Sequence, residues 1–314
     1  MNIKIKEFIR KIPLVFPLLK IIQDRRYLYH YIQGFITHKK IRNFFSELES
    51  KLFYKNKEIN NSANTNKLDI HNIKEDGFIE NPIKIDELQI KEMFDFLKIK
   101  PMHDPESEKG DYFYLDNMPE DTKRGFYRCE DVVCAPNVLT IANDPAILSI
   151  ASEYFNATPS IDYIGSWWSF PSNNLALTQS YHRDIDTLNS LKFFIYLTDV
   201  EQTSGPFIYI KGSHDSSYKT KKDKMHGDEE IHALYGKDDI KDITGKKGHN
   251  FIADTYGFHK GLAPTENNRL VLQIIYTLKR TPFGPKKPFI DFNNAENLSK
   301  FLLSPYTNRH IIRF

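Results

Sequence analysis

Residues 269–278 read RLVLQIIYTL, a run of β-branched, aromatic and large apolar residues that begins with one charged side chain, Arg269. In an extended chain alternate side chains share a face, so Arg269, Val271 and Gln273 are expected to lie together. Five more runs of this kind, separated by Gly, Pro, Asn and Asp, occupy residues 161–170, 175–182, 191–200, 206–211 and 249–254. Short strands at this spacing, without alternating helices, predict a β-sandwich or barrel.

The chain before these strands has a different pattern. Apolar residues recur at three- and four-residue spacing over residues 35–52, and a second helical pattern covers residues 85–97. We therefore expect a helical region over residues 1–100, followed by one β domain over residues 101–314. Within that domain the charged segment 215–247 is too polar for a core, and it is predicted to be a solvated flap near one mouth of the barrel.

The net charge of +2 is unevenly distributed along the 314 residues. Residues 1–42 carry ten Lys or Arg and only two acidic residues. The basic residues cluster in one terminal segment without an interleaved aromatic stacking surface, so we expect no nucleic-acid partner. Its apolar stretch 12–22 is too short to span a bilayer. The two interpretations left are a helix docked on the body and a peripheral contact of residues 1–42 with an anionic membrane surface.

The two cysteines, Cys129 and Cys134, have no zinc-finger spacing. A reduced pair in a cytoplasmic protein is the expectation, with a disulfide as the alternative. We therefore predict a cytoplasmic protein, either free or resting on the inner membrane surface.

Candidate metal ligands lie in the stretch Gln179-Ser180-Tyr181-His182-Arg183-Asp184. In an extended chain His182 and Asp184 point to the same face, so an imidazole and a carboxylate converge. A third ligand is available 75 residues later, where His259 stands between Gly257 and Gly261. Two histidines and one carboxylate on one face of an octahedron leave three open positions, which suits Fe(II) binding a co-substrate and O2 together.

Arg269 follows His259 by ten residues, on the strand described above. A guanidinium is costly to bury unless a bidentate anion pairs with it, and a carboxylate of 2-oxoglutarate is such an anion. An exposed arginine at a strand end is the alternative. A zinc hydrolase could use the same three ligands, but it would not require Arg269.

Four linked motifs follow one another along the chain: His182-x-Asp184, residues 191–200, Gly205-Pro206-Phe207 with Gly212-Ser213-His214, and His259 with Arg269. In this order, over roughly residues 125–280, they resemble the phytanoyl-CoA dioxygenase family of Fe(II)/2-oxoglutarate oxygenases. The resemblance implies a double-stranded β-helix, or jelly roll, with helical additions. It also implies that His182, Asp184 and His259 ligate Fe(II) and that Arg269 binds 2-oxoglutarate.

The resemblance extends to further side chains. It places Lys192 where a co-substrate contact often sits, although an exposed lysine at a strand start is the alternative, and Gln179 is expected as another such contact. Where family members commonly carry a hydroxyl residue two positions after the distal histidine, this chain has Gly261. Four aromatic residues are expected to form walls of the substrate pocket, with plain core packing as the alternative: Tyr163, Trp167, Tyr181 and Phe194.

The activity implied by the resemblance is oxidative decarboxylation of 2-oxoglutarate to succinate and CO2, with hydroxylation of a second substrate by O2. Nothing in the sequence names that substrate, and we expect a small molecule or a glycan- or lipid-linked intermediate. The alternative is a catalytically silent jelly roll that acts as a binding or scaffold protein.

Overall fold

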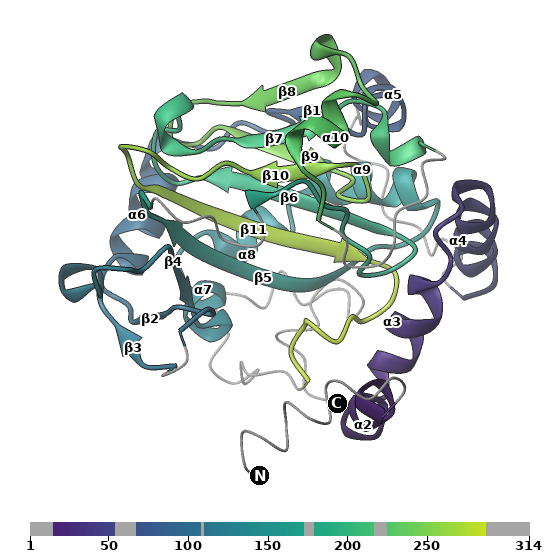
Figure 1. Cartoon of the computed structure of the whole chain (residues 1–314), viewed down its shortest axis with the longest axis horizontal. Coiled ribbons are helices and arrows are strands. Elements are labelled where there is room, and N and C mark those ends of the chain that lie inside the picture. Colours follow the sequence, from purple (N-terminus) through teal and green to yellow (C-terminus); the bar gives the residue numbers. More distant parts are fainter. Residues whose placement is uncertain (1–14, 54–66, 108–109, 173–178, 217–224, 287–314) are drawn as a thin grey trace.

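In the computed structural model the chain forms two antiparallel β-sheets that face each other, with helices packed on the outside (Figure 1). The structure describes residues 15–53, 67–107, 110–172, 179–216 and 225–286. The larger sheet has the strand order β1-β9-β6-β11-β5-β4-β2-β3, and the smaller sheet has the order β10-β7-β8. This is the jelly-roll architecture expected from the sequence.

The strands are β1 (Phe78–Glu80), β2 (Met102–His103), β3 (Tyr112–Phe113), β4 (Arg124–Tyr127), β5 (Ser160–Ser169), β6 (Ser190–Tyr196), β7 (Phe207–Ile210), β8 (Ile240–Ile243), β9 (Asn250–Ala253), β10 (His259–Gly261) and β11 (Arg269–Thr277). The α-helices are α2 (Val15–Gln23), α3 (Arg26–Gly34), α4 (Lys39–Phe53), α5 (Lys67–Glu75), α6 (Glu87–Leu97), α7 (Cys129–Cys134), α8 (Val138–Ala142), α9 (Pro145–Phe155) and α10 (Asp228–His232).

Strand alternation divides the large sheet into two faces with different roles. On β5, Ile164 and Trp168 belong to the main hydrophobic core, which also contains Met93 of α6 and Ile147 of α9. Helices α6 to α9 therefore supply the layer that covers the outer face. The opposite face carries Phe194, which packs in a second cluster with residues of both sheets. The functional side chains described below project from this inner face.

Helix α9 shows how local sequence fixes the outer layer. Asp144 caps its first turn by accepting a hydrogen bond from the Ala146 amide at 2.8 Å, and Pro145 occupies the first helical position, where no amide hydrogen is needed. The helix ends at Asn156, whose φ of 51° is the left-handed conformation that asparagine tolerates. Both ends of the helix are thus specified by residues that stop it from extending.

The N-terminal helices hold the loop that follows Asp184. Gln33 of α3 donates to the Ile185 carbonyl at 2.7 Å, and the buried Arg42 of α4 donates to the Thr187 carbonyl. The Arg42 guanidinium also lies 4.2 Å from the ring centroid of Tyr256. The helical region is therefore attached to the β-sheets at the segment that carries a candidate ligand.

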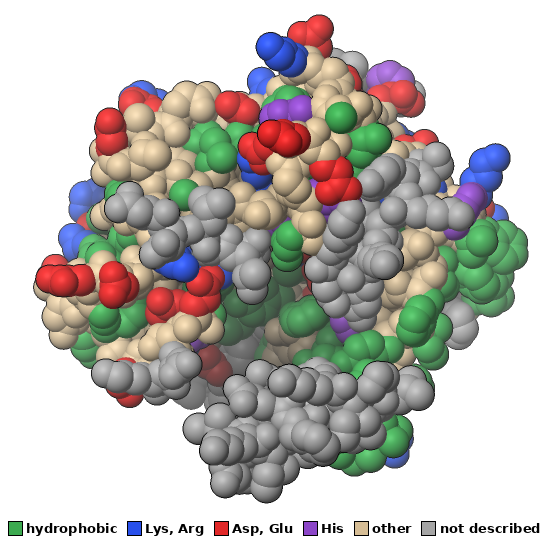
Figure 2. Space-filling view, viewed as in Figure 1, with side chains coloured by type: hydrophobic (Ala, Val, Ile, Leu, Met, Phe, Trp, Pro, Cys, Tyr) green, Lys and Arg blue, Asp and Glu red, His purple; other side chains and the backbone are tan. Residues whose placement is uncertain are grey.

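The other face of α4 is exposed and hydrophobic, as the green side chains over this helix in Figure 2 show. Phe44 and Leu52 are 63% and 64% exposed. None of the described helices is both long and apolar enough to cross a membrane. The predicted contact of residues 1–42 with a membrane surface stays a prediction, and residues 1–14 lie outside the described part.

Several sequence predictions are confirmed and others are wrong. Strands β5, β6, β7, β9 and β11 match predicted runs to within a few residues, and helix α6 matches the predicted helix. The predicted strand at 175–182 is not seen at its described end, where Tyr181 and His182 form only isolated bridges, and residues 173–178 lie outside the described part. Segment 215–247 was predicted to be solvated, yet it contributes β8, which pairs with β7. Cys129 and Cys134 are free thiols, as expected.

Candidate active site

A cavity of about 230 Å³ lies against the inner face of the large sheet. Residues that are paired across neighbouring strands lie next to each other on one face of the sheet, and these paired residues form the cavity wall. One row joins Arg269 of β11 to Ser169 of β5 and, beyond it, Arg124 of β4. The cavity is lined by eighteen residues: Arg124, Phe126, Tyr163, Trp167, Ser169, Gln179, His182, Asp184, Lys192, Phe194, Tyr196, Phe207, Phe251, His259, Gly261, Arg269, Val271 and Gln273.

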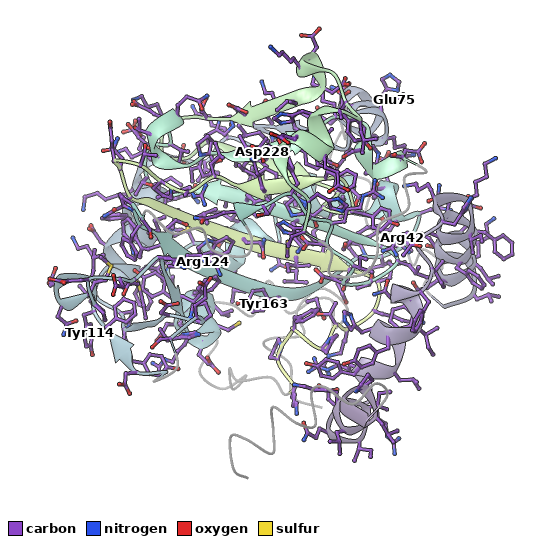
Figure 3. All side chains as sticks on the ribbon, viewed as in Figure 1. Arg42, Glu75, Tyr114, Arg124, Tyr163 and Asp228 are labelled. Carbon is purple, nitrogen blue, oxygen red and sulfur yellow. The ribbon has the colours of Figure 1, made fainter. Side chains whose placement is uncertain are left out.

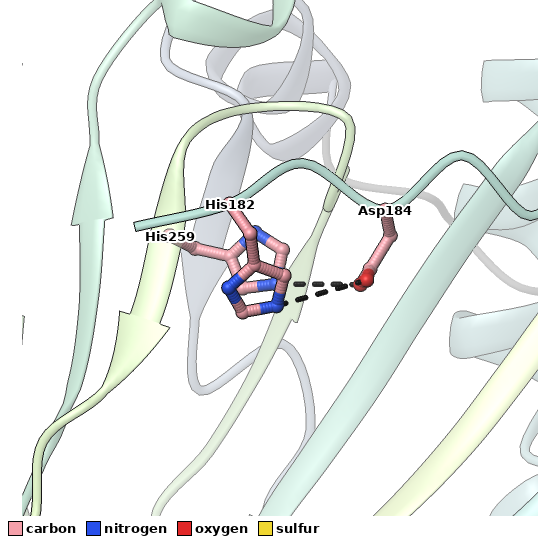
Figure 4. Close-up of side chains that lie close together, drawn as sticks. All are labelled: His182, Asp184 and His259. Carbon is pink, nitrogen blue, oxygen red and sulfur yellow. Dashed lines mark ion pairs between the residues drawn. The ribbon is translucent and has the colours of Figure 1, made fainter. Parts of the chain in front are cut away.

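His182, Asp184 and His259 meet in this cavity (Figure 4). Their ligand atoms all lie within 4.8 Å of one another. The Oδ2 atom of Asp184 is 3.3 Å from His259 Nε2, and the Oδ1 atom is 3.8 Å from His182 Nε2. Within the part of the chain that the structure describes, this is the one group of three such residues close enough to hold a metal ion.

Backbone hydrogen bonds bring the two histidines together. The His182 amide donates to the His259 carbonyl at 3.0 Å, and the His259 amide donates back to the His182 carbonyl at 3.1 Å. The Asp184 amide is tied to the Thr255 carbonyl at 2.8 Å. Two histidines 77 residues apart in sequence are therefore held together by main-chain contacts.

Each imidazole is oriented so that its Nε2 atom faces Asp184. His182 Nδ1 is 2.9 Å from the Ser180 carbonyl oxygen, and His259 Nδ1 is 2.9 Å from the Gly257 carbonyl oxygen. A carbonyl oxygen can only accept, so Nδ1 of each ring carries the proton. The Nε2 lone pairs are then available to a metal, which is the usual arrangement for histidine ligands.

Electrostatics favours the protonation states that a metal site needs. Burial, reinforced by the charge of His259, lowers the pKa of His182 to about 4, so this ring is neutral at neutral pH. Burial opposes ionisation of Asp184, but Lys192 and His259 outweigh it and hold the pKa of this carboxyl well below its usual range. A neutral imidazole and an ionised carboxylate are the ligand forms that bind a divalent cation.

Lys192 contacts Asp184 directly. Its Nζ atom is 2.6 Å from Asp184 Oδ2 and 3.0 Å from Asp186 Oδ2, and the side chain is almost fully buried. The sequence predicted Lys192 as a co-substrate contact, which stays a prediction; in the structure Lys192 lines the cavity and its ammonium contacts these two carboxylates. Burial alone would lower the pKa of Lys192, but the two carboxylates raise it, so the side chain is charged.

Arg269 is buried at the other end of the cavity. Its Nη2 atom donates to the Ser169 hydroxyl at 3.2 Å, while Nε and Nη1 have no hydrogen-bond partner among the described residues. Burial and the neighbouring charge of Arg124 lower the pKa of Arg269, which remains a cation. An unsatisfied buried guanidinium is costly, so the pocket fits a carboxylate ligand at this position.

Gly261 lies between the distal histidine and this arginine. A Cβ atom at position 261 would stand 3.2 Å from Arg269 Nη2, so a larger side chain there would press on the guanidinium. The hydroxyl that family members carry at this position is absent, and the Ser169 hydroxyl contacts the arginine from β5 instead.

The donor set fits Fe(II) with 2-oxoglutarate. Two imidazoles and one carboxylate leave coordination positions open, and the buried cation of Arg269 lines the same cavity, with its Nη2 atom beside Gly261. A closed structural zinc site would instead have four protein ligands. The site can therefore hold a metal together with a dicarboxylate.

Three of the four predicted pocket aromatics, Tyr163, Trp167 and Phe194, line the cavity, and so does Gln179. Tyr181 was predicted among them but does not line it. Its ring is buried in a separate cluster with Ile208 and Phe258, where it packs against the outer side of the small sheet, because strand alternation turns it away from His182.

Sequence reasoning missed several lining residues. Arg124 and Phe126 come from β4, whose four residues are too short to be recognised as a strand. In Figure 3, Arg124 and Tyr163 mark the adjacent strands β4 and β5. Asp186, which pairs with Lys192 and does not itself line the cavity, could also have been found, since it follows Asp184 at the same two-residue spacing that links His182 to Asp184.

Comparisons with known proteins agree with this geometry. The family model of phytanoyl-CoA dioxygenase (PhyH) matches residues 120–269. A search of the curated proteins gave no match.

Two solved structures are similar in fold. The non-haem α-ketoglutarate-dependent epimerase SnoN from nogalamycin biosynthesis has a TM-score of 0.50 and 14% identity, covering 67% of this chain and 82% of its own. EctD from S. alaskensis, solved with 2-oxoglutarate and 5-hydroxyectoine, has a TM-score of 0.51 and 18% identity, covering 74% of this chain and 84% of its own. The match over residues 120–269 covers just under half of the chain, and together with the shared fold it agrees with the resemblance to the phytanoyl-CoA dioxygenase family of Fe(II)/2-oxoglutarate oxygenases.

Proposed function

We propose that this protein hydroxylates a small molecule, and that O2 and 2-oxoglutarate are consumed as succinate and CO2 are released. One observation carries the proposal. The buried guanidinium of Arg269 opens into the same 230 Å³ cavity as His182, Asp184 and His259. A scaffold protein would have no reason to keep a buried cation without a partner beside three converging metal ligands.

In this proposal each residue has a defined task. His182 and His259 bind Fe(II) through Nε2, and Asp184 binds it through a carboxylate oxygen. Arg269, supported by Ser169, holds the distal carboxylate of 2-oxoglutarate. The bound metal supplies the activation of O2. Aromatic side chains of both sheets border the cavity and exclude water from it: Phe194, Phe207 and Phe251.

Charge in the cavity favours a neutral substrate. Among the described residues, Arg124 pairs with Glu106 at 2.7 Å, and Lys192 pairs with Asp184 and Asp186. Arg269 is the remaining cation, and 2-oxoglutarate satisfies it. An ionised substrate group would then be buried without a partner, at a cost of several kcal/mol.

Polar groups that could recognise a neutral substrate also face the cavity. Gln273 and Tyr163 line it, next to Trp167, whose ring is stacked on Phe126 at 5.3 Å. An amide and a hydroxyl beside an aromatic face suit a substrate with hydroxyl or amide groups. A small molecule or a glycan fits this wall better than a thioester of a nucleotide-bearing carrier.

The test is an anaerobic titration of the purified protein with Fe(II) and 2-oxoglutarate, followed by the visible metal-to-ligand charge-transfer band. We expect a band in the wild-type protein, loss of the band in Asp184→Ala, and a weakened band in Arg269→Met. Asp199→Ala removes an exposed carboxylate outside the cavity and is expected to leave the band unchanged. Absence of the band from the wild-type protein would instead favour a silent scaffold. Release of succinate under air then measures turnover.

A further inference from the structure

Lys192 lies on the inner face of β6, where β9 and β11 flank it. Its side chain is 8% exposed, and its ammonium is held between Asp184 Oδ2 at 2.6 Å and Asp186 Oδ2 at 3.0 Å. A buried lysine held by two carboxylates is a charged group with a fixed position. Two of the three donors of this ammonium are therefore committed to protein carboxylates.

We infer that Lys192 is a positioning residue for the metal-binding carboxylate and does not bind the co-substrate. A carboxylate can rotate about its Cβ–Cγ bond and can bind an ion through one oxygen or through both. The hydrogen bond from Lys192 to Oδ2 restricts that rotation and favours binding through a single oxygen. Groups that hydrogen-bond to ligating side chains orient the ligands and tune the metal.

Asp186 completes the arrangement. An ammonium next to a divalent cation would be repelled by it, and the second carboxylate supplies the negative charge that keeps Lys192 in place. The Asp186 carbonyl in turn accepts a hydrogen bond from Gln33 of α3 at 3.2 Å. The metal ligand is thus linked through Lys192 and Asp186 to the N-terminal helices.

The inference rests on the proposed function, and its test separates the two. Metal binding is measured first, by anaerobic calorimetric titration with Fe(II) and by the d–d absorption of Co(II), without 2-oxoglutarate. Binding of 2-oxoglutarate is then measured at saturating Fe(II). A wild-type protein that binds neither would reject the proposed function itself. The variants are compared only on a wild-type protein that binds both.

For Lys192→Met, which keeps the length of the side chain and removes its charge, we expect metal affinity to fall about 10- to 100-fold. The Co(II) spectrum should also change shape, because the carboxylate is no longer held. Affinity for 2-oxoglutarate at saturating Fe(II) should stay within about threefold. Lys279→Met removes a lysine that pairs with the buried Glu49 at 2.7 Å away from the cavity, and it should change neither affinity.

Asp186→Asn keeps the ammonium and removes one of its two anchors, so it carries the test if Lys192→Met does not fold. We expect it to weaken metal binding in the same direction and by a smaller factor. Loss of 2-oxoglutarate affinity with unchanged metal affinity would overturn the inference, since Lys192 would then contact the co-substrate. Tighter metal binding in Lys192→Met would also overturn it, because the ammonium would be competing with the metal for Asp184.

Discussion

Ser169 of β5 lies directly opposite Arg269 of β11, and its hydroxyl accepts a hydrogen bond from Arg269 Nη2 at 3.2 Å. The contact orients one edge of the guanidinium toward the strand and leaves Nε and Nη1 for a ligand. It also accounts for the glycine at position 261, because a side chain there would crowd the same nitrogen. The anion site is therefore assembled from three strands of two sheets.

Removing the Ser169 hydroxyl should weaken 2-oxoglutarate binding. A hydrogen bond to a charged group contributes roughly 1.5 kcal/mol, so Ser169→Ala should raise the dissociation constant about tenfold. Arg269→Met leaves the carboxylate without its cation and should raise it at least ~30-fold. Both are measured by anaerobic titration at saturating Fe(II). Ser166→Ala, which truncates a buried serine on the opposite face of the same strand, is the matched control and should have no effect.

Gly165 gives Tyr163 its place in the cavity wall. A Cβ atom at position 165 would stand 2.6 Å from the Tyr163 hydroxyl oxygen and Cε1, which is closer than atoms can approach. Gly165→Ala should therefore displace the tyrosine ring and lower the free energy of unfolding by about 1–3 kcal/mol.

A double-mutant cycle checks this explanation. In a Tyr163→Ala background, Gly165→Ala should lower the free energy of unfolding much less, because the ring that it would displace is absent. Chemical denaturation measures all four proteins. Equal costs in both backgrounds would show that the glycine matters for some other reason. Metal affinity should be the same in all four.

The two thiols should differ sharply in reactivity. Burial raises the pKa of Cys129 to about 12, and its Sγ atom donates to the Ile164 carbonyl at 3.1 Å. Cys134 is exposed. The thiolate is the reactive form of cysteine. A thiol reagent at pH 8 should therefore label Cys134 rapidly and Cys129 only after the protein unfolds. Cys134→Ser should abolish the rapid phase, and rapid labelling that survives this substitution would contradict the assignment.

Metal binding should stabilise the folded protein. A metal ion present at a concentration 100 times its dissociation constant adds about 2.7 kcal/mol to the free energy of unfolding. Co(II) should therefore raise the midpoint of thermal unfolding by several degrees. His182→Gln should remove this shift. His249→Gln alters a histidine that pairs with Glu80 at 3.1 Å and lines no part of the cavity, so the shift should persist. A shift of equal size in both variants would place the ion elsewhere.

The sequence was a good guide wherever a long strand carried the information. Arg269 and Gln273 were placed on one face by alternation alone, and β5, β6 and β11 appear where the apolar runs predicted them. His182 and Asp184, which the structure brings together with His259, were singled out because they are two residues apart. Short strands could not be predicted from the sequence. Strand β10 has only three residues, and β8 lies in a charged segment whose pairing partner is distant in sequence.

The sequence also did not allow the contact partners of buried side chains to be predicted. Nothing local distinguishes a lysine that binds a co-substrate from one that binds a carboxylate, because the answer depends on which loop folds over β6. Here the loop after Asp184 brings Asp186 to Lys192, and helix α3 holds that loop in position. Tyr181 could have been placed correctly from the sequence, because the alternation that turns His182 into the cavity turns its neighbour away from it.

The reciprocal backbone hydrogen bonds between His182 and His259 have a consequence for how the protein acquires its metal. His259 takes its place only when β10 has docked beside the His182 segment, and β10 is contributed by a late part of the chain. A chain in which β10 has not docked therefore offers only two of the three residues and should hold iron poorly. Binding of the ion by all three residues then requires that the two sheets have closed, so an incompletely folded chain is not expected to carry a redox-active metal.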